Sequence, residues 1–113
     1  MAKLRNEYVE YITDLLHPFG ISNVRAMFGG YGIYKNGIIF AIIADNELYF
    51  KGDKITEHFF QEQGSQPFTY IAKGKEYKMS YWHVPPEMLD DPDRLQTWFA
   101  MAYQAGVSAK KLK

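Results

Sequence analysis

The 113-residue chain is long enough for one domain and too short for two comfortable ones. Its 47% hydrophobic and 17% aromatic content suffices for a buried core and excludes an intrinsically disordered chain. The 13 basic and 13 acidic residues give a formal net charge of +0, which disfavours autonomous DNA binding because phosphate contacts require a basic surplus.

The chain contains no cysteine, which excludes disulfides, thiolate metal ligands and cysteine nucleophiles and agrees with a reducing compartment. The opening MAKLRNEYVEYITDLL interleaves charged and apolar residues, so it has no signal-peptide core. The longest strongly apolar run, GIIFAIIA, is well short of the ~18 residues of a membrane-spanning helix. We therefore expect a cytoplasmic protein without membrane contact.

The first predicted element is an amphipathic helix over residues 4–19. Its apolar residues form two rows that repeat at steps of three or four. The rows are Leu4, Tyr8, Tyr11 and Leu15, and Val9, Ile12, Leu16 and Phe19. Two rows make a wide apolar face, as expected of a helix that crosses a sheet, and Gly20 is the predicted stop.

Residues 24–51 predict a three-stranded antiparallel meander. Asn36-Gly37 separates GIYK from IIFAII and is the strongest two-residue hairpin signal a sequence offers. The pair DN separates IIFAII from ELYFK in a similar way. The central strand, 38–43, is apolar throughout, which indicates burial on both faces or on one face plus a partner. The preceding VRAMF is either a short extra strand or an extended lead-in.

A short helix and a second hairpin follow. Asp53 is expected to begin the helix, which turns Ile55, Phe59 and Phe60 inward and ends at Gly64. FTYIA and EYKMSYW then pair across the turn KG to form the hairpin.

The last predicted helix has Asp91 as its cap and Pro92 at its first position, and runs to about Ala105, before Gly106. Its buried stripe is predicted to be Leu95, Trp98, Phe99 and Ala102. The element order is α-β-β-β-α-β-β-α. Residues 1–113 are thus expected to form a single α+β domain, an antiparallel sheet packed by helices.

The glycine-rich GGYG, with Gly29, Gly30 and Gly32, does not match a phosphate-binding loop. Such a loop ends in Gly-Lys-Ser/Thr at the start of a helix, whereas GGYG leads into a strand. The dinucleotide-binding spacing and the serine of a nucleophile elbow are also absent. We interpret these glycines as residues that allow positive φ and close backbone packing where the sheet begins.

The titratable residues do not form a recognisable catalytic or metal set. His17, His58 and His83 lie far apart in the sequence, and none has a second ligand at metal spacing. Asp45 and Glu47 could be an acid/base pair, but turn and strand-edge roles explain them more simply. No nucleophile, base and orienting group occur together. The sequence predicts no enzyme, no cofactor and no metal site.

Tyrosine is frequent on the predicted strands, with lysine nearby. The residues concerned are Tyr31, Tyr34, Tyr49, Tyr70, Tyr77 and Tyr81, and Lys35, Lys51, Lys73, Lys75 and Lys78. Three interpretations stay open: half-buried strand residues at the rim of the core, a tyrosine-rich protein interface, and a surface on which unpaired bases stack. We rank them in this order.

Several of these motifs together resemble the N-terminal domain of the TfoX/Sxy family. The matching segments are RAMFGGYG at 25–32, FAII at 40–43, LYFK at 48–51, YWHVP at 81–85 and the helix that carries Trp98. The Met-Phe-Gly-Gly run within this meander is quite specific. The resemblance covers nearly the whole chain.

The resemblance implies a secretion-chaperone-like α+β fold without enzymatic activity. Full-length members are bacterial regulators of natural competence that act with the cyclic-AMP receptor protein and carry a second, helical C-terminal domain. This chain ends soon after its third predicted helix, so we expect a stand-alone module. Its partner is expected to be a protein, such as part of the transcription machinery, with direct nucleic-acid binding as the alternative. The expected family-motif and interaction residues are Arg25, Met27, Phe28, Gly29, Gly30, Tyr31, Gly32, Tyr49, Lys51 and Tyr81.

Self-association is a further expectation, because the central strand and Tyr49-Phe50 offer more apolar surface than three short helices cover. We predict a twofold dimer that uses a sheet edge or the outer sheet face. Light scattering over about a hundredfold concentration range, which spans roughly 2.7 kcal/mol of association free energy, tests this. A mass that stays near 13.1 kDa at every concentration would contradict the dimer.

Overall fold

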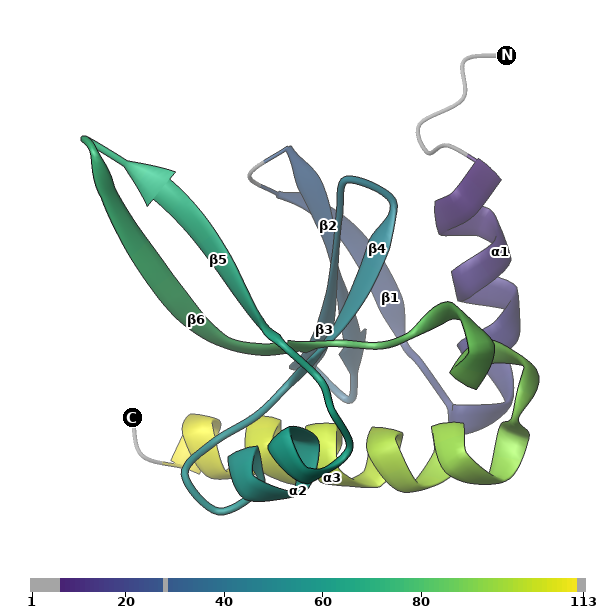
Figure 1. Ribbon diagram of the computed structural model, residues 1–113. Helices are drawn as coiled ribbons and strands as arrows, with labels where there is room; N and C mark the ends of the chain where they lie inside the picture. The colour runs from purple at the N-terminus through teal and green to yellow at the C-terminus, as the bar shows by residue number, and fades with distance from the viewer. Residues whose placement is uncertain (1–6, 28, 112–113) are drawn as a thin grey trace, which may run out of the picture.

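The computed structural model describes residues 7–27 and 29–111 and shows the predicted α+β architecture (Figure 1). The helical elements are α1 (Glu7–Leu16), η1 (His17–Phe19), α2 (Glu57–Glu62), η2 (Pro86–Asp90) and α3 (Pro92–Lys111). The strands are β1 (Asn23–Met27), β2 (Gly30–Lys35), β3 (Ile38–Ala44), β4 (Glu47–Lys51), β5 (Pro67–Ala72) and β6 (Lys75–His83).

All six strands form one antiparallel sheet in the order β1-β2-β3-β4-β6-β5. The predicted meander β2-β3-β4 is confirmed. Its turns adopt the left-handed backbone that the hairpin signals require, with φ of 54° at Asn36, 52° at Asp45 and 58° at Asn46. The first four residues of the VRAMF segment, for which the sequence allows either a strand or an extended lead-in, lie in the extra edge strand β1.

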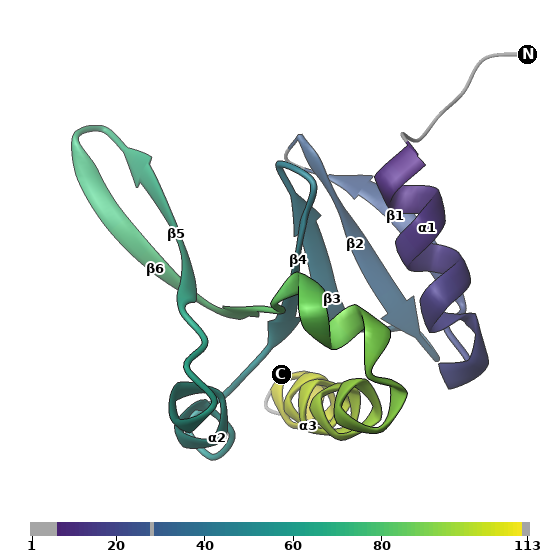
Figure 2. The ribbon, with the colours of Figure 1, turned by 45° about the vertical axis from the view of Figure 1, so that its right-hand side comes forward.

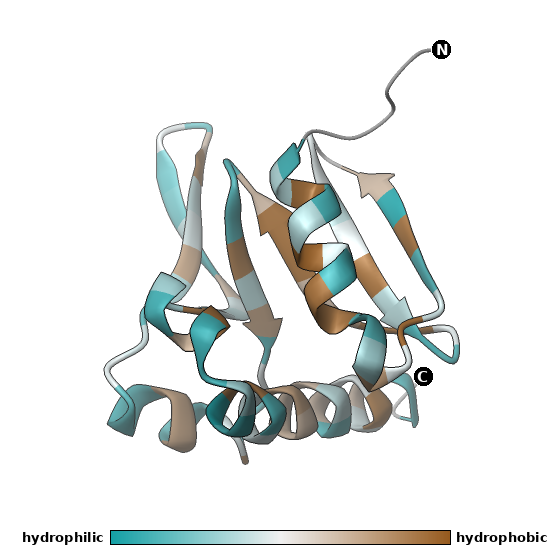
Figure 3. Ribbon diagram, turned by 90° about the vertical axis from the view of Figure 1, so that its right-hand side faces the viewer, coloured by the Kyte–Doolittle hydropathy of each residue, from teal (hydrophilic) through white to brown (hydrophobic). Residues whose placement is uncertain are grey.

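The helices pack on one face of the sheet, which we call the inner face. Figure 2 shows α3 across the base of the strands, and Figure 3 looks from the side of α1, which crosses in front of them. Val9, Ile12 and Leu16 of α1 are buried, as one predicted row requires. Tyr11 of the other row is exposed, and Leu4 lies outside the described residues.

The last helix is longer than predicted, because it passes through Gly106 and ends at Lys111. A Cβ at Gly106 would lie 2.6 Å from the carbonyl oxygen of Ile39 and 2.7 Å from Cγ2 of Ile38. The glycine therefore allows α3 to approach β3 closely, rather than ending the helix. The predicted stripe, which includes Trp98, is buried.

The short helix begins later than predicted. The Asp53 carboxylate accepts backbone hydrogen bonds from Ile55 at 3.0 Å and Thr56 at 2.9 Å, so it caps the turn before α2. Because Ile55 lies in this turn and not on the helix, its side chain is 75% exposed and the predicted inward position is wrong. Phe60 is buried and Phe59 half-buried, as predicted.

The contact between α3 and β3 predicts an unusual response to alanine. In an exposed helix, Gly→Ala stabilises by ~1 kcal/mol. At Gly106 the added methyl group meets the backbone of Ile39, so we expect Gly106→Ala to lower the free energy of unfolding by about 1–3 kcal/mol. Urea unfolding measures this, with Gln104→Ala on the exposed side of α3 as the control. A stabilised Gly106→Ala variant would show that the two elements are not in close contact.

Candidate functional site

The face of the sheet opposite the helices, which we call the outer face, carries the tyrosines of β4 and β6. Phe50 and Trp82 are opposite each other in the register and both belong to the core, so their neighbours point the other way. Tyr49, Lys51 and Tyr81 therefore share the outer face. Tyr81 is nonetheless buried, and Lys51 Nζ lies 4.9 Å from the centroid of its ring.

An apolar groove lies between the meander and this hairpin, with a cavity volume of about 540 Å³. We call it the outer groove. Its main lining side chains are Met27 of β1, Ile39 and Ile42 of β3, and Phe68, Tyr70, Met79 and Tyr81 of the hairpin. Both walls are aliphatic or aromatic, and methionine side chains in each wall can adapt to different shapes. The groove is suited to apolar side chains.

Two glycines of the GGYG motif shape the floor of the outer groove. A Cβ at Gly32 would lie 3.0 Å from both Met27 Sδ and Ile39 Cδ1, so these side chains close over the bare backbone. A Cβ at Gly30 would collide with the carbonyl oxygen of Ile43. Gly29 has φ +75° and lies in the turn between β1 and β2. The structural interpretation of the motif, positive φ and close packing, is confirmed.

Three cations share the outer face of the sheet with the groove. The Arg25 guanidinium lies 5.6 Å from the Tyr34 ring centroid, and Lys51 Nζ lies 4.9 Å from that of Tyr81. Lys75 precedes Tyr77 by two residues on β6, so it shares the strand face of Tyr77. These three cations, Arg25, Lys51 and Lys75, are called the basic rim below.

The neutral sequence hides an uneven distribution of charge. The helices α1, α2, η2 and α3 carry the acidic residues Glu7, Glu10, Asp14, Glu57, Glu62, Glu87, Asp90 and Asp93, and the basic residues Arg94, Lys110 and Lys111. The strands carry the basic residues Arg25, Lys35, Lys51, Lys75 and Lys78, and the acidic residues Glu47 and Glu76. Acidic charge therefore gathers in the helix layer, and basic charge in the sheet.

Glu47 and His83 connect β4 to β6 beside the groove. His83 Nε2 lies 2.5 Å from Glu47 Oε1, and the His83 ring packs edge-on against Tyr49 at 5.5 Å. This contact gives His83 a structural role and Glu47 a partner other than Asp45. Within residues 7–27 and 29–111, no three metal-binding side chains cluster.

Burial raises the pKa of two tyrosines to about 12. For Tyr81 burial is the main cause and the nearby Tyr34 adds to it; for Tyr8 burial is followed by the charge of Glu47. Burial, then Glu47 and Asp45, also raises the pKa of Tyr49. Tyr8, Tyr49 and Tyr81 thus stay neutral, with phenolic hydroxyl groups that can donate hydrogen bonds.

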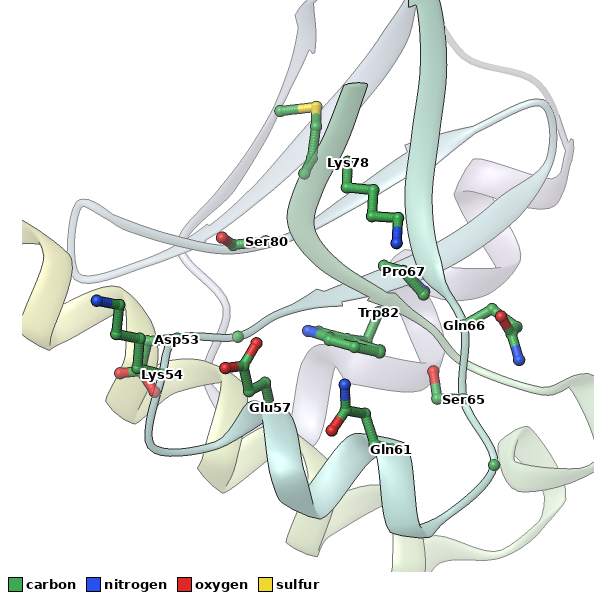
Figure 4. A pocket seen from close by; sticks show the side chains of 13 residues that line it. Asp53, Lys54, Glu57, Gln61, Ser65, Gln66, Pro67, Lys78, Ser80 and Trp82 are labelled. Carbon is green, nitrogen blue, oxygen red and sulfur yellow. The ribbon is translucent and has the colours of Figure 1, made fainter. Parts of the chain in front are cut away.

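A second hollow, of about 720 Å³, lies between α2 and the inner side of β6 (Figure 4). The Trp82 indole forms part of its wall and stacks on Phe60 at 6.1 Å. Glu57 and Gln61 of α2 lie beside the indole, whereas Lys54 points away from it. The hollow is an open polar depression, without the convergent apolar walls of the outer groove.

The predicted interaction residues occupy several places. Arg25, Met27, Gly32, Tyr49, Lys51 and Tyr81 share the outer face, whereas Tyr31 packs against the core and also lines the groove. Phe28 lies outside the described residues. Sequence reasoning missed Ile39, Ile42, Phe68 and Met79 as groove residues. Alternation along the strands could have placed each on a face, but only the pairing of β4 with β6 brings the two walls together.

Comparison with known proteins identifies the family. The model of the TfoX N-terminal domain matches residues 14–106. This chain belongs to the TfoX N-terminal domain family. The resemblance seen in the sequence motifs is thereby confirmed, and the match includes all of the described groove residues.

Two curated relatives are DNA transformation proteins. TfoX1 of Aliivibrio fischeri is 27% identical over 84 residues, which cover 74% of this chain and 38% of the relative. TfoX of Haemophilus influenzae is 24% identical over 94 residues, which cover 81% of this chain and 43% of the relative. The chain thus spans less than half the length of either relative. Among the helices in the described part of the chain, none has the length and apolarity needed to cross a membrane.

The buried Tyr81 predicts a late step in an alkaline titration. Unfolded tyrosine ionises near pH 10, whereas the folded Tyr81 holds its proton up to about 12. Below pH 10 both states keep the proton, so the raised pKa does not change the free energy of unfolding. As the pH rises from 10 towards 12 the unfolded state ionises first, so the free energy of unfolding falls. In Tyr81→Phe we expect the free energy of unfolding to fall less over this pH range, and one late step in tyrosinate absorbance to be lost. An unchanged titration curve would place the Tyr81 hydroxyl in water.

Proposed function

We propose that this chain is a cytoplasmic, non-enzymatic regulatory domain of DNA transformation that acts by binding a protein through the outer groove. The observation that carries the proposal is an apolar groove on the outer face, in a domain whose family includes DNA transformation proteins. Soluble domains rarely leave such a surface without a binding role. Tyrosine, methionine and arginine, which line or border it, are the residues enriched in protein interfaces.

The partner that the family resemblance implies is the cyclic-AMP receptor protein or a component of transcription associated with it. The chain corresponds to 38% and 43% of its two relatives, so we assign it a docking step and not the whole regulatory activity. In this proposal the outer groove makes the protein contact, and the rest of a longer regulator can add others.

A chimera tests the regulatory function. We expect a Haemophilus influenzae TfoX whose N-terminal region is replaced by this chain to restore transformation in a strain that lacks its own TfoX. Introducing Ile42→Asp in the groove wall opposite the hairpin should lower the transformation frequency, because the aspartate places a charge in an apolar contact. Ile55→Asp, at an exposed turn away from the groove, is the matched control.

Protein levels of the three chimeras must be compared on immunoblots. The proposal fails if the parent chimera accumulates to the level of the native relative and transformation stays absent. It also fails if Ile42→Asp, at equal abundance, transforms as well as Ile55→Asp.

Direct nucleic-acid binding is the second candidate function, favoured by the basic residues and tyrosines of the strands. A salt titration of binding to duplex and single-stranded DNA separates it from protein binding. Micromolar affinity with a steep salt dependence would place nucleic acid above a protein partner.

A further inference from the structure

One wall of the outer groove is a hairpin that the rest of the domain supports at its base only. β6 pairs with β4 from Tyr81 to His83, and β6 towards its tip pairs with β5. In Figures 1 and 2 the hairpin accordingly diverges from the meander. A two-stranded ribbon is marginally stable by itself in water. An occupant of the groove would therefore stabilise this wall as well as bury apolar surface.

The two faces of the hairpin differ in what they can contact. Tyr70 and Tyr77 stack on each other on the groove side, with centroids 5.3 Å apart, and Met79 follows on the same side with 39% of its surface exposed. Ile71 alternates with Tyr70, so it lies on the opposite side, where it is 76% exposed. Only the side that carries Met79 faces the groove. Met79 and Ile71 are therefore exposed apolar residues on opposite sides of one hairpin, and the effects of changing them can be compared directly.

The charged residues around the groove favour one kind of binding partner over others. The basic rim carries Arg25, Lys51 and Lys75, while the carboxylate of Glu47 on the same face is already in contact with His83. The acidic residues of the chain lie mostly in the helix layer, on the other side of the sheet. An occupant that carries carboxylates beside its apolar side chains complements both features of the site.

We propose that the outer groove binds an acidic amphipathic segment of a protein partner. The segment inserts apolar side chains between Ile42 and Met79 and places carboxylates beside the basic rim. A cavity of about 540 Å³ suits a few such anchors, and lies within the roughly 300–1,000 Å³ of most ligand sites. This inference rests on the proposed protein-binding function and adds the chemistry of the partner.

Two other occupants fit less well. A second copy placed face to face by a twofold axis would bring one basic rim against another, which opposes association and leaves a sheet edge for the dimer expected from the sequence. A single-stranded nucleic acid requires exposed ring faces on which bases stack. Here Tyr70 and Tyr77 cover part of each other, and the Tyr81 ring is buried beneath Lys51.

The test uses fluorescent peptides and the 113-residue chain. One peptide repeats leucine at helical spacing with glutamate between; a second replaces every glutamate with lysine; an oligo-dT strand is the nucleic-acid probe. Fluorescence anisotropy should show saturable binding of the glutamate peptide, and binding of the lysine peptide weaker by about tenfold or more, equivalent to ~1.4 kcal/mol.

Paired variants locate the binding surface. Met79→Asp and Ile71→Asp change exposed residues on opposite sides of one hairpin, and Lys75→Glu and Lys78→Glu do the same for charge. We expect the groove-side member of each pair to weaken glutamate-peptide binding by about tenfold and the other member by less than about twofold. Far-UV circular dichroism checks that all four variants fold.

Several results would overturn the inference. One is that the glutamate and lysine peptides bind with equal affinity, and another is that both variants of a pair lose the same affinity for the glutamate peptide. The inference also fails if oligo-dT binds more tightly than the glutamate peptide and in a salt-dependent way. A dimer that forms with rising concentration and is abolished by Met79→Asp would overturn it too. Absence of glutamate-peptide binding also overturns it. If the chimera still restores transformation in that case, the regulatory function stands and only the chemistry of the partner is wrong.

Discussion

The pairing of β6 with β4 is the contact on which the architecture of the outer face depends. It extends over three residues, Tyr81 to His83, and the Trp82 side chain enters the core between them and stacks on Phe60. The Ser65 hydroxyl donates a hydrogen bond to the His83 carbonyl at 2.7 Å, and Glu47 contacts the His83 ring. A junction so short leaves the remainder of the hairpin free to diverge from the meander, and that divergence creates the groove.

The inner face is organised by close approach of backbone segments. Gly106 lets α3 lie against β3, and Gly52 leaves room for the Trp82 indole, whose Nε1 and Cδ1 would be 2.7 Å from an added Cβ. Phe50 and Trp82 point to the inner face, so the alternation of side chains along β4 and β6 places Tyr49 and Tyr81 on the outer face, whether or not a partner is present.

Local signals in the sequence predicted most of the elements, and long-range contacts explain the errors. The Asn36-Gly37 turn specifies its hairpin by itself, because its left-handed backbone suits few other structures. The local pattern predicts a helix end at Gly106, because the contact of Gly106 with Ile39 joins residues 67 positions apart in the chain and no local pattern reveals it. The two walls of the groove are separated in the same way, so Ile42 and Met79 could be placed on strands but not beside each other.

The net charge describes the molecule as a whole, but it does not predict the local charge of the individual surfaces. A formal charge of +0 argues against strong attraction to a polyanion, yet the helices are mainly acidic and the strands mainly basic. Two cations of the rim, Arg25 and Lys51, lie over aromatic rings on the outer face. The separation of charge between two layers therefore allows a neutral domain to present one face that discriminates between acidic and basic partners.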